Sequence, residues 1–176
     1  MRRFMWAVVL TVAVVLPTRA QETPQIELMG GYSYLRSDIG GVDQGLNGWN
    51  GSITENINHW LGGTADFSGF YAHPGGINVN THTFMFGPHF AYRKSGSFTP
   101  FAHVLIGGMR ASQGYLGISQ QKTDFAAALG GGVDVQVHKI ISIRIIQAEY
   151  VYTPYLNMRQ DNLRISGGIV LRFGRK

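Results

Sequence analysis

The stretch NLRISGGIVLRF (residues 162–173) alternates between two kinds of residue along its whole length. One parity is mostly large and apolar, and the other is polar or small; the first comprises Leu163, Ile165, Gly167, Ile169, Leu171 and Phe173, and the second Asn162, Arg164, Ser166, Gly168, Val170 and Arg172. A period of two is that of a β-strand, whose successive side chains point to opposite faces. The stretch therefore predicts a strand with one apolar and one polar face.

The same period, in places weaker, predicts seven further strands, at 25–36, 47–57, 60–71, 80–93, 98–110, 124–137 and 140–152. In the last of these, Ser142 and Arg144 have one parity while Gln147 and Glu149 have the other. One extra residue near Ile145 and Ile146, a β-bulge, would bring all four to one face.

The connections between these segments alternate in length. Long ones are expected at 37–46, 73–79, 111–122 and 153–161, and short ones at 56–59, 94–97 and 138–139. Strands of spanning length joined by long loops on one side and tight turns on the other are typical of a transmembrane β-barrel. We predict an all-β fold, an eight-stranded antiparallel up-and-down transmembrane barrel, with both termini on the side of the short turns.

Length and composition limit the alternatives. The chain has 176 residues, 24 glycines, no cysteine and only 14% charged residues, well below the quarter or so usual in soluble domains. Zero cysteine excludes disulfides, thiolate metal sites and a cysteine nucleophile. We expect one domain of 21–176 after a secretory signal peptide at 1–20, which has Arg2 and Arg3, an apolar run and a small residue, Ala20, at its end.

The net charge of +5 belongs partly to that signal. Without its three arginines, the rest of the chain has 12 basic and 10 acidic residues. It carries no basic run with interleaved aromatics that could follow a phosphate backbone, so we expect no nucleic-acid partner.

Alternation alone also fits a soluble eight-stranded barrel whose apolar face lines a cup. We favour lipid outside, because the polar face is small residues and scattered charges rather than the Lys and Glu of a wetted exterior. Aromatic residues also gather toward the strand ends, as in the girdles of membrane barrels. The expected girdle comprises Tyr32, Tyr34, Trp49, Trp60, Tyr71, Tyr92, Phe125, Tyr150 and Tyr152.

The polar face would then line a narrow lumen. The charges expected there are Glu27, Asp66, Arg93, Asp124, Asp134, Arg144, Arg164 and Arg172, while Arg110 and Glu149 are less securely placed. Opposite charges in such a lumen should pair, since an unpaired buried charge costs several kcal/mol. A salt-bridged plug and an ion-selective path or gate are both compatible with this set, and the near balance of acids and bases favours the plug.

With these residues in view, the chain resembles the small OmpA-like outer-membrane β-barrel family of Gram-negative bacteria. The C-terminal strand carries the sharpest likeness, because Ser166, Gly168, Leu171 and Phe173 match the spacing of the family's assembly signal. The chain departs from that pattern in continuing past Phe173 to Lys176 and in having a non-aromatic Leu171. The resemblance implies outer-membrane localisation, contact with membrane lipid and lipopolysaccharide, and insertion by the barrel-assembly machinery as a monomer.

No nucleophile, base and acid stand in a recognisable catalytic motif, and the six histidines show no pair at metal-binding spacing on one strand face. We therefore expect no enzyme activity, metal or cofactor. The predicted function is that of a structural outer-membrane barrel with a closed lumen and four surface loops. The alternatives are a narrow or gated porin-like channel for small solutes, a loop-borne adhesin, and a soluble lipocalin-like binder.

Overall fold

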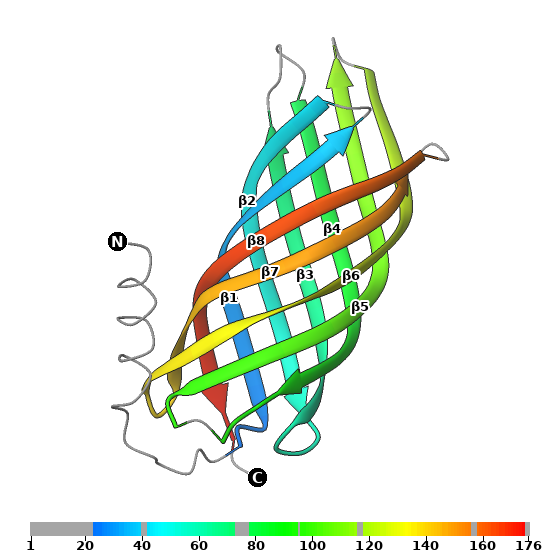
Figure 1. The fold of residues 1–176 in the computed structure, drawn as a ribbon. Helices are drawn as coiled ribbons and strands as arrows, with labels where there is room; N and C mark the ends of the chain where they lie inside the picture. The colour runs from blue at the N-terminus through cyan, green and yellow to red at the C-terminus, as the bar shows by residue number, and fades with distance from the viewer. Residues whose placement is uncertain are drawn as a thin grey trace, which may run out of the picture.

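A computed structural model describes residues 23–39, 42–72, 78–94, 96–115, 118–155 and 158–174. Eight strands form one closed barrel, in which each pairs antiparallel with its neighbours in chain order and β8 closes on β1 (Figure 1). The strands are β1 (Ile26–Ile39), β2 (Val42–Asn56), β3 (Leu61–Ala72), β4 (Asn78–Ala91), β5 (Phe98–Tyr115), β6 (Ile118–His138), β7 (Ile141–Tyr155) and β8 (Met158–Phe173). The predicted eight-stranded antiparallel barrel is confirmed, while the expected signal peptide at 1–20 lies outside the described residues and stays a prediction.

The two ends of the barrel differ in their connections. Ile26 of β1 pairs with Phe173 of β8 at the end that also holds the turns after β2, β4 and β6. We call it the terminal end and the opposite one the far end. Paired residues can be followed from strand to strand around the barrel, and the path that starts at Leu28 of β1 returns to β1 beside Ser37. This stagger accompanies the tilt of the strands visible in Figure 1.

The faces of the barrel are inverted relative to a protein in water. Large apolar side chains project outward, among them Phe86, Leu129 and Ile145, each about 60% exposed. Charged and amide side chains such as Glu149 and Arg164 are buried inside, at 1% exposure. An apolar exterior around a closed sheet suits hydrocarbon, because every backbone donor and acceptor of such a sheet is satisfied within it. Among the described residues, no helix is long and apolar enough to cross a membrane.

The bulge predicted in β7 is confirmed. The register of β7 against β8 shifts between Arg144 and Gln147, and both intervening residues, Ile145 and Ile146, are exposed. The extra residue turns Gln147 inward, on the same face as Arg144, where both are buried.

The prediction of four long loops is largely wrong. The β1–β2 ladder continues to the pair Ile39–Val42, the β5–β6 ladder to Tyr115–Ile118 and the β7–β8 ladder to Tyr155–Met158. Most of 37–46, 111–122 and 153–161 is therefore paired strand, and in the expected loop at 73–79 the described residues 78–79 also belong to a strand. Backbone pairing therefore continues where the period of two in the sequence fades.

Candidate functional site: the lumen of the barrel

The inward side chains form two groups of ions near the terminal end and the middle of the barrel. We call the larger group the central network; its residues are Asn50, Asp66, Ser68, His103, Asp134, Arg144, Gln147, Glu149 and Arg164. The smaller group, the terminal cluster, consists of Glu27, Arg93 and Arg172. They are the largest polar assemblies on the inner face and so form the candidate site.

Arg164 links two opposite walls of the barrel. Its Nε and Nη2 donate to the two carboxylate oxygens of Glu149 on β7, at 2.6 and 2.7 Å. Its Nη1 donates to Oδ1 of Asp66 on β3, at 2.9 Å, and to Oγ of Ser68 at 2.7 Å. Because β3 and β7 are four strands apart in an eight-stranded barrel, this one guanidinium spans the lumen.

The network continues from Glu149 toward the terminal end. Gln147 Nε2 donates to Glu149 at 2.8 Å, and Arg144 Nη1 donates to Gln147 Oε1 at 2.6 Å. Arg144 in turn holds Asp134 on β6 through two bonds of 2.7 and 3.0 Å. Two-pronged arginine–carboxylate pairs of this kind are among the strongest polar contacts in proteins.

A histidine and an asparagine provide further contacts to the two central carboxylates. His103 Nε2 lies 2.8 Å from Glu149 Oε1, and Asn50 Nδ2 donates to Asp66 Oδ2 at 2.8 Å. Phe101 lies under the guanidinium of Arg144, with its ring centre 4.1 Å from Cζ. Each ion of the network is therefore held by several partners, as a buried charge requires.

The terminal cluster joins side chains of three strands or strand ends near the terminal end. Glu27 on β1 lies 3.4 Å from both Arg93 Nη2 and Arg172 Nε. Arg93, just beyond β4, also donates to Asn56 Oδ1 at 2.9 Å and to the carbonyl of His59 at 3.0 Å. The cluster thus ties the turn after β2 to side chains from β1 and β8.

The charges inside the barrel balance. Among the described residues, the buried acids and the buried arginines number four each, and they are Glu27, Asp66, Asp134, Glu149, Arg93, Arg144, Arg164 and Arg172. A balanced, mutually paired set attracts neither cations nor anions strongly, in contrast to the single-sign rings that line selective pores.

Apolar side chains fill the lumen beyond the central network, toward the far end. One cluster joins Leu35, Leu46 and Phe70 from β1, β2 and β3. The other is formed by Met85, Leu105, Ala126, Ala128 and Val151 from β4 to β7. On each of β3, β5 and β7 the apolar residue lies further toward the far end than the polar residue of the network, while buried Thr153 and Asn162 keep polar groups beside these clusters.

The structure places seven of the eight expected lumen charges in these two groups; Asp124 is inward but only half-buried, near the far end of β6. Glu149, which the sequence left uncertain, lies in the central network, and Arg110 is exposed on the outside. The contacts of His103, Gln147 and Asn50 with these ions were not predicted from the sequence. The bulge is the signal for Gln147, because it moves the residue to the face of Arg144.

The expected girdle residues lie on the outer face. Eight of the nine aromatic side chains named above are exposed, and Tyr152 is half-buried. In the assembly motif, Ser166 and Gly168 face inward while Leu171 and Phe173 face outward. Within the described part of the chain, no three His, Asp or Glu side chains are grouped so that they could hold a metal ion.

The comparisons with known proteins agree with this architecture. The sequence model of the outer membrane protein beta-barrel domain matches residues 6–173. The fold is similar to that of Neisserial surface protein A, with a TM-score of 0.70 and 14% identity over 85% of this chain and 97% of that one.

Two other solved barrels are similar in fold. The attachment invasion locus protein Ail of Yersinia pestis, in complex with a heparin analogue, has a TM-score of 0.59 and 18% identity, covering 83% of this chain and 97% of its own. The N-terminal barrel of Pseudomonas aeruginosa OprF has a TM-score of 0.56 and 10% identity, with coverages of 84% and 98%. A comparison with curated protein sequences finds no match.

The match of the sequence model extends over nearly the whole chain, and the barrel, its inverted faces and its structural relatives are those of outer-membrane proteins. The protein therefore belongs to the outer membrane protein beta-barrel domain family and resides in the Gram-negative outer membrane.

Proposed function

We propose that the protein is a non-catalytic scaffold of the outer membrane, a monomeric barrel whose lumen is closed to solutes. The observation that carries this proposal is the contact of Arg164 with both Asp66 and Glu149, which joins opposite walls through the middle of the lumen. The terminal cluster and the two apolar clusters support it, because they fill the lumen below and above that contact.

In this proposal the terminal end faces the periplasm, the aromatic girdles lie at the two membrane interfaces, and the barrel-assembly machinery reads the motif of Ser166, Gly168, Leu171 and Phe173. The eight lumen residues predicted from sequence then serve rigidity rather than transport. The alternative in the same lumen is a narrow or gated channel, which would require the contacts of Arg164 to open.

The absence of cysteine from the chain offers a direct test. Ser166 is buried, and its hydroxyl lies 2.7 Å from that of Ser33 across the β1–β8 pair. We expect the thiol of Ser166→Cys to resist a charged, membrane-impermeant methanethiosulfonate in the folded barrel and to react once urea unfolds it. The matched control is Ser97→Cys, in the turn before β5, which should react in the folded protein.

Reaction of the Ser166→Cys thiol at the rate of the Ser97→Cys thiol would show that water and ions enter the lumen. Such a result would contradict the closed scaffold and favour the narrow channel. The control for folding is the gel mobility of each unheated variant. A mobility equal to that of the unheated wild type shows that the variant is folded when it is probed.

A second candidate function is attachment through the far end, since β5 and β6 form a hairpin that extends to the pair Tyr115–Ile118 at the top of Figure 1. Removing 112–121, which excises facing partners from the two strands, should leave a folded barrel and abolish binding of expressing bacteria to host cells. Unchanged binding after this removal would eliminate the hairpin as an adhesin.

A further inference from the structure

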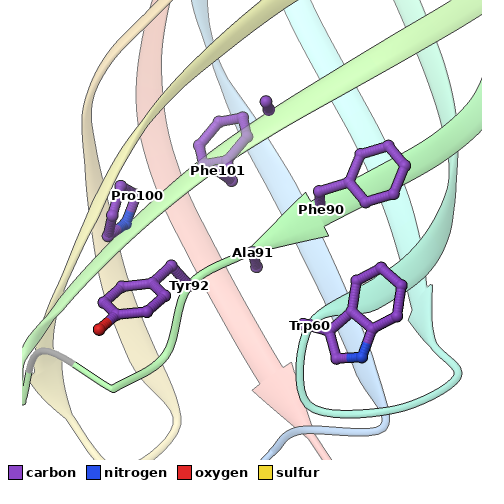
Figure 2. A pocket seen from close by; sticks show the side chains of 7 residues that line it. Trp60, Phe90, Ala91, Tyr92, Pro100 and Phe101 are labelled. Atoms are coloured by element: carbon purple, nitrogen blue, oxygen red, sulfur yellow. The ribbon is translucent and has the colours of Figure 1, made fainter.

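A shallow groove lies on the outer wall of the barrel, at the terminal end of β4 and β5. It has a volume of about 390 Å³, and its lining residues, which include Trp60, Phe90, Tyr92, Pro100 and Ala102, are all apolar or aromatic (Figure 2). This volume lies in the range of small-ligand sites, which is roughly 300–1,000 Å³. The groove opens on the outer wall, and Phe101, whose ring lies under Arg144, also lines it.

Two sets of rings form the sides of the groove. Trp60 and Phe90 are stacked, with ring centres 6.1 Å apart and planes 15° from parallel. Tyr92 and Pro100 lie on the other side in Figure 2. The outward residue of β5 next along the chain is Ala102, whose small side chain leaves the space between the rings open. The shape is a slot between aromatic walls.

Hydrogen bonds hold the backbone of the turn that carries Trp60 before anything binds. Asn58 Oδ1 accepts from the backbone N–H of Trp60 at 2.9 Å, and the carbonyl of Trp60 accepts from the N–H of Ala91 at 2.9 Å. Arg93 donates from inside the barrel to the carbonyl of His59 at 3.0 Å. A preformed site spends little of its binding energy on ordering itself.

The chemistry of the slot and its mouth identifies the ligand. Lys94 is exposed and follows the lining residue Tyr92 by two positions, beyond the end of β4. Glu55, an outward acid of the terminal end, is on β2, with β3 between it and the strands of the groove. An apolar groove with a lysine two residues from its lining fits an acyl chain attached to a phosphate.

We propose that this groove is a binding site for one anionic phospholipid, whose acyl chain lies between the Trp60–Phe90 pair and Tyr92 and whose phosphate meets Lys94. A peptide strand is a poorer fit, because the described strands close on one another and leave no edge to which it could add. The site goes beyond the proposed scaffold function and holds whether or not the lumen conducts.

Trp60 reports on the site directly. The chain has three tryptophans, so Trp6→Phe/Trp49→Phe leaves Trp60 as the only fluorophore, and Trp6→Phe/Trp60→Phe leaves Trp49, outside the groove, as the control. Each variant is refolded into phosphatidylcholine vesicles that contain a minor fraction of brominated phosphatidylglycerol, whose bromines quench tryptophan on contact. We expect an about five-fold preference of the Trp60 site for phosphatidylglycerol, the factor that one lysine near an anionic lipid supplies, and no preference at Trp49.

Two substitutions in the Trp60 reporter separate a site from ordinary boundary lipid. Ala102→Phe should fill the slot and reduce quenching to the level expected from lipid composition, whereas Ala148→Phe, at an exposed alanine on β7, should leave it unchanged. Lys94→Gln should abolish the preference for phosphatidylglycerol. Equal quenching of Trp60 and Trp49, or a preference that survives Ala102→Phe or Lys94→Gln, would overturn the proposal.

Discussion

Arg164 is 1% exposed and charged, and it is stable inside the barrel because two carboxylates surround it. Removing water from an ion costs several kcal/mol, and paired geometry with several hydrogen bonds offsets that cost. Arg164 makes four such bonds to three residues. The contacts are therefore mutually dependent: loss of any charged member leaves its partners buried without compensation.

For Arg164→Ala we expect the free energy of unfolding to fall by about 3–5 kcal/mol, since Glu149 and Asp66 would lose their shared cation. Urea unfolding of the refolded barrel in vesicles, followed by tryptophan fluorescence, measures the change. Lys139→Ala, at an exposed residue of the β6–β7 turn, is the control and should stay within about 0.5 kcal/mol of the wild type.

The cause of that loss can be isolated. The triple variant Arg164→Met/Glu149→Gln/Asp66→Asn removes the three charges of the cross-lumen contact and keeps side chains of similar length. We expect it to regain most of the stability that Arg164→Ala loses. If Arg164→Ala unfolds like the wild type, the cross-lumen contact contributes nothing to stability and the plug loses its energetic basis.

Parity in the sequence was sufficient to predict seven buried ions of the lumen, because a strand with one lipid-facing side leaves its charges on the other. It could not predict which ions meet. Arg164 reaches Asp66, 98 positions earlier in the chain, and that contact depends on closure and stagger of the whole sheet. The contact of His103 with Glu149 was equally hidden, because it joins β5 to β7 across β6.

At the scale of a strand, the bulge in β7 determines which residues enter the lumen. Ile145 and Ile146 both face outward, so the segments before and after them keep their polar residues inside. If the strand alternated regularly with both isoleucines in place, every side chain on one side of them would exchange faces. The bulge therefore places Glu149 within reach of Arg164.

Deleting Ile146 should leave a folded barrel, because it restores the period of two and keeps Arg144, Gln147 and Glu149 on the inner face. Deleting Ala148 instead should prevent folding, because either Gln147 or Glu149 would then face lipid. The difference in gel mobility between unheated and boiled samples reports the folded barrel. Loss of the heat-modifiable band in the Ile146 deletion, or a band of normal intensity from the Ala148 deletion, would contradict the role assigned to the bulge.

Glycine is required at positions where two strands approach each other closely. Gly168 pairs with Gly31, and a Cβ on Gly168 would overlap the carbonyl oxygen of Gly30. Gly63, by contrast, has no neighbouring atom within 4 Å of such a Cβ. The close approach gives Gly168 a packing role that is independent of the predicted assembly signal.

We expect Gly168→Ala to destabilise the barrel by about 1–3 kcal/mol in refolding experiments without any assembly factor. Gly63→Ala should refold like the wild type. Normal refolding of Gly168→Ala in vitro, combined with failed insertion in cells, would assign the residue to assembly and not to packing.

For the whole molecule, the combination of an apolar exterior, a closed sheet and a neutral, filled interior defines the proposed scaffold. Eight strands and their order were predictable because the period of two and the alternating connections specify a hairpin sequence. The lengths of the far-end hairpins were not, since residues such as those of 111–115 are paired in β5 although their parity carries no apolar signal. Pairing there depends on the neighbouring strand and not on the face that a side chain presents.

Single-channel conductance of the refolded wild-type barrel in a planar bilayer tests the closed lumen most directly. The variant Arg164→Ala/Glu149→Ala/Asp66→Ala, which removes the cross-lumen contact without leaving an unpaired member of it, serves as the comparison. The closed lumen predicts a wild type that inserts, as judged by its heat-modifiable mobility, and yields no discrete current steps. Reproducible steps from the inserted wild type would contradict it and establish an open path through the barrel.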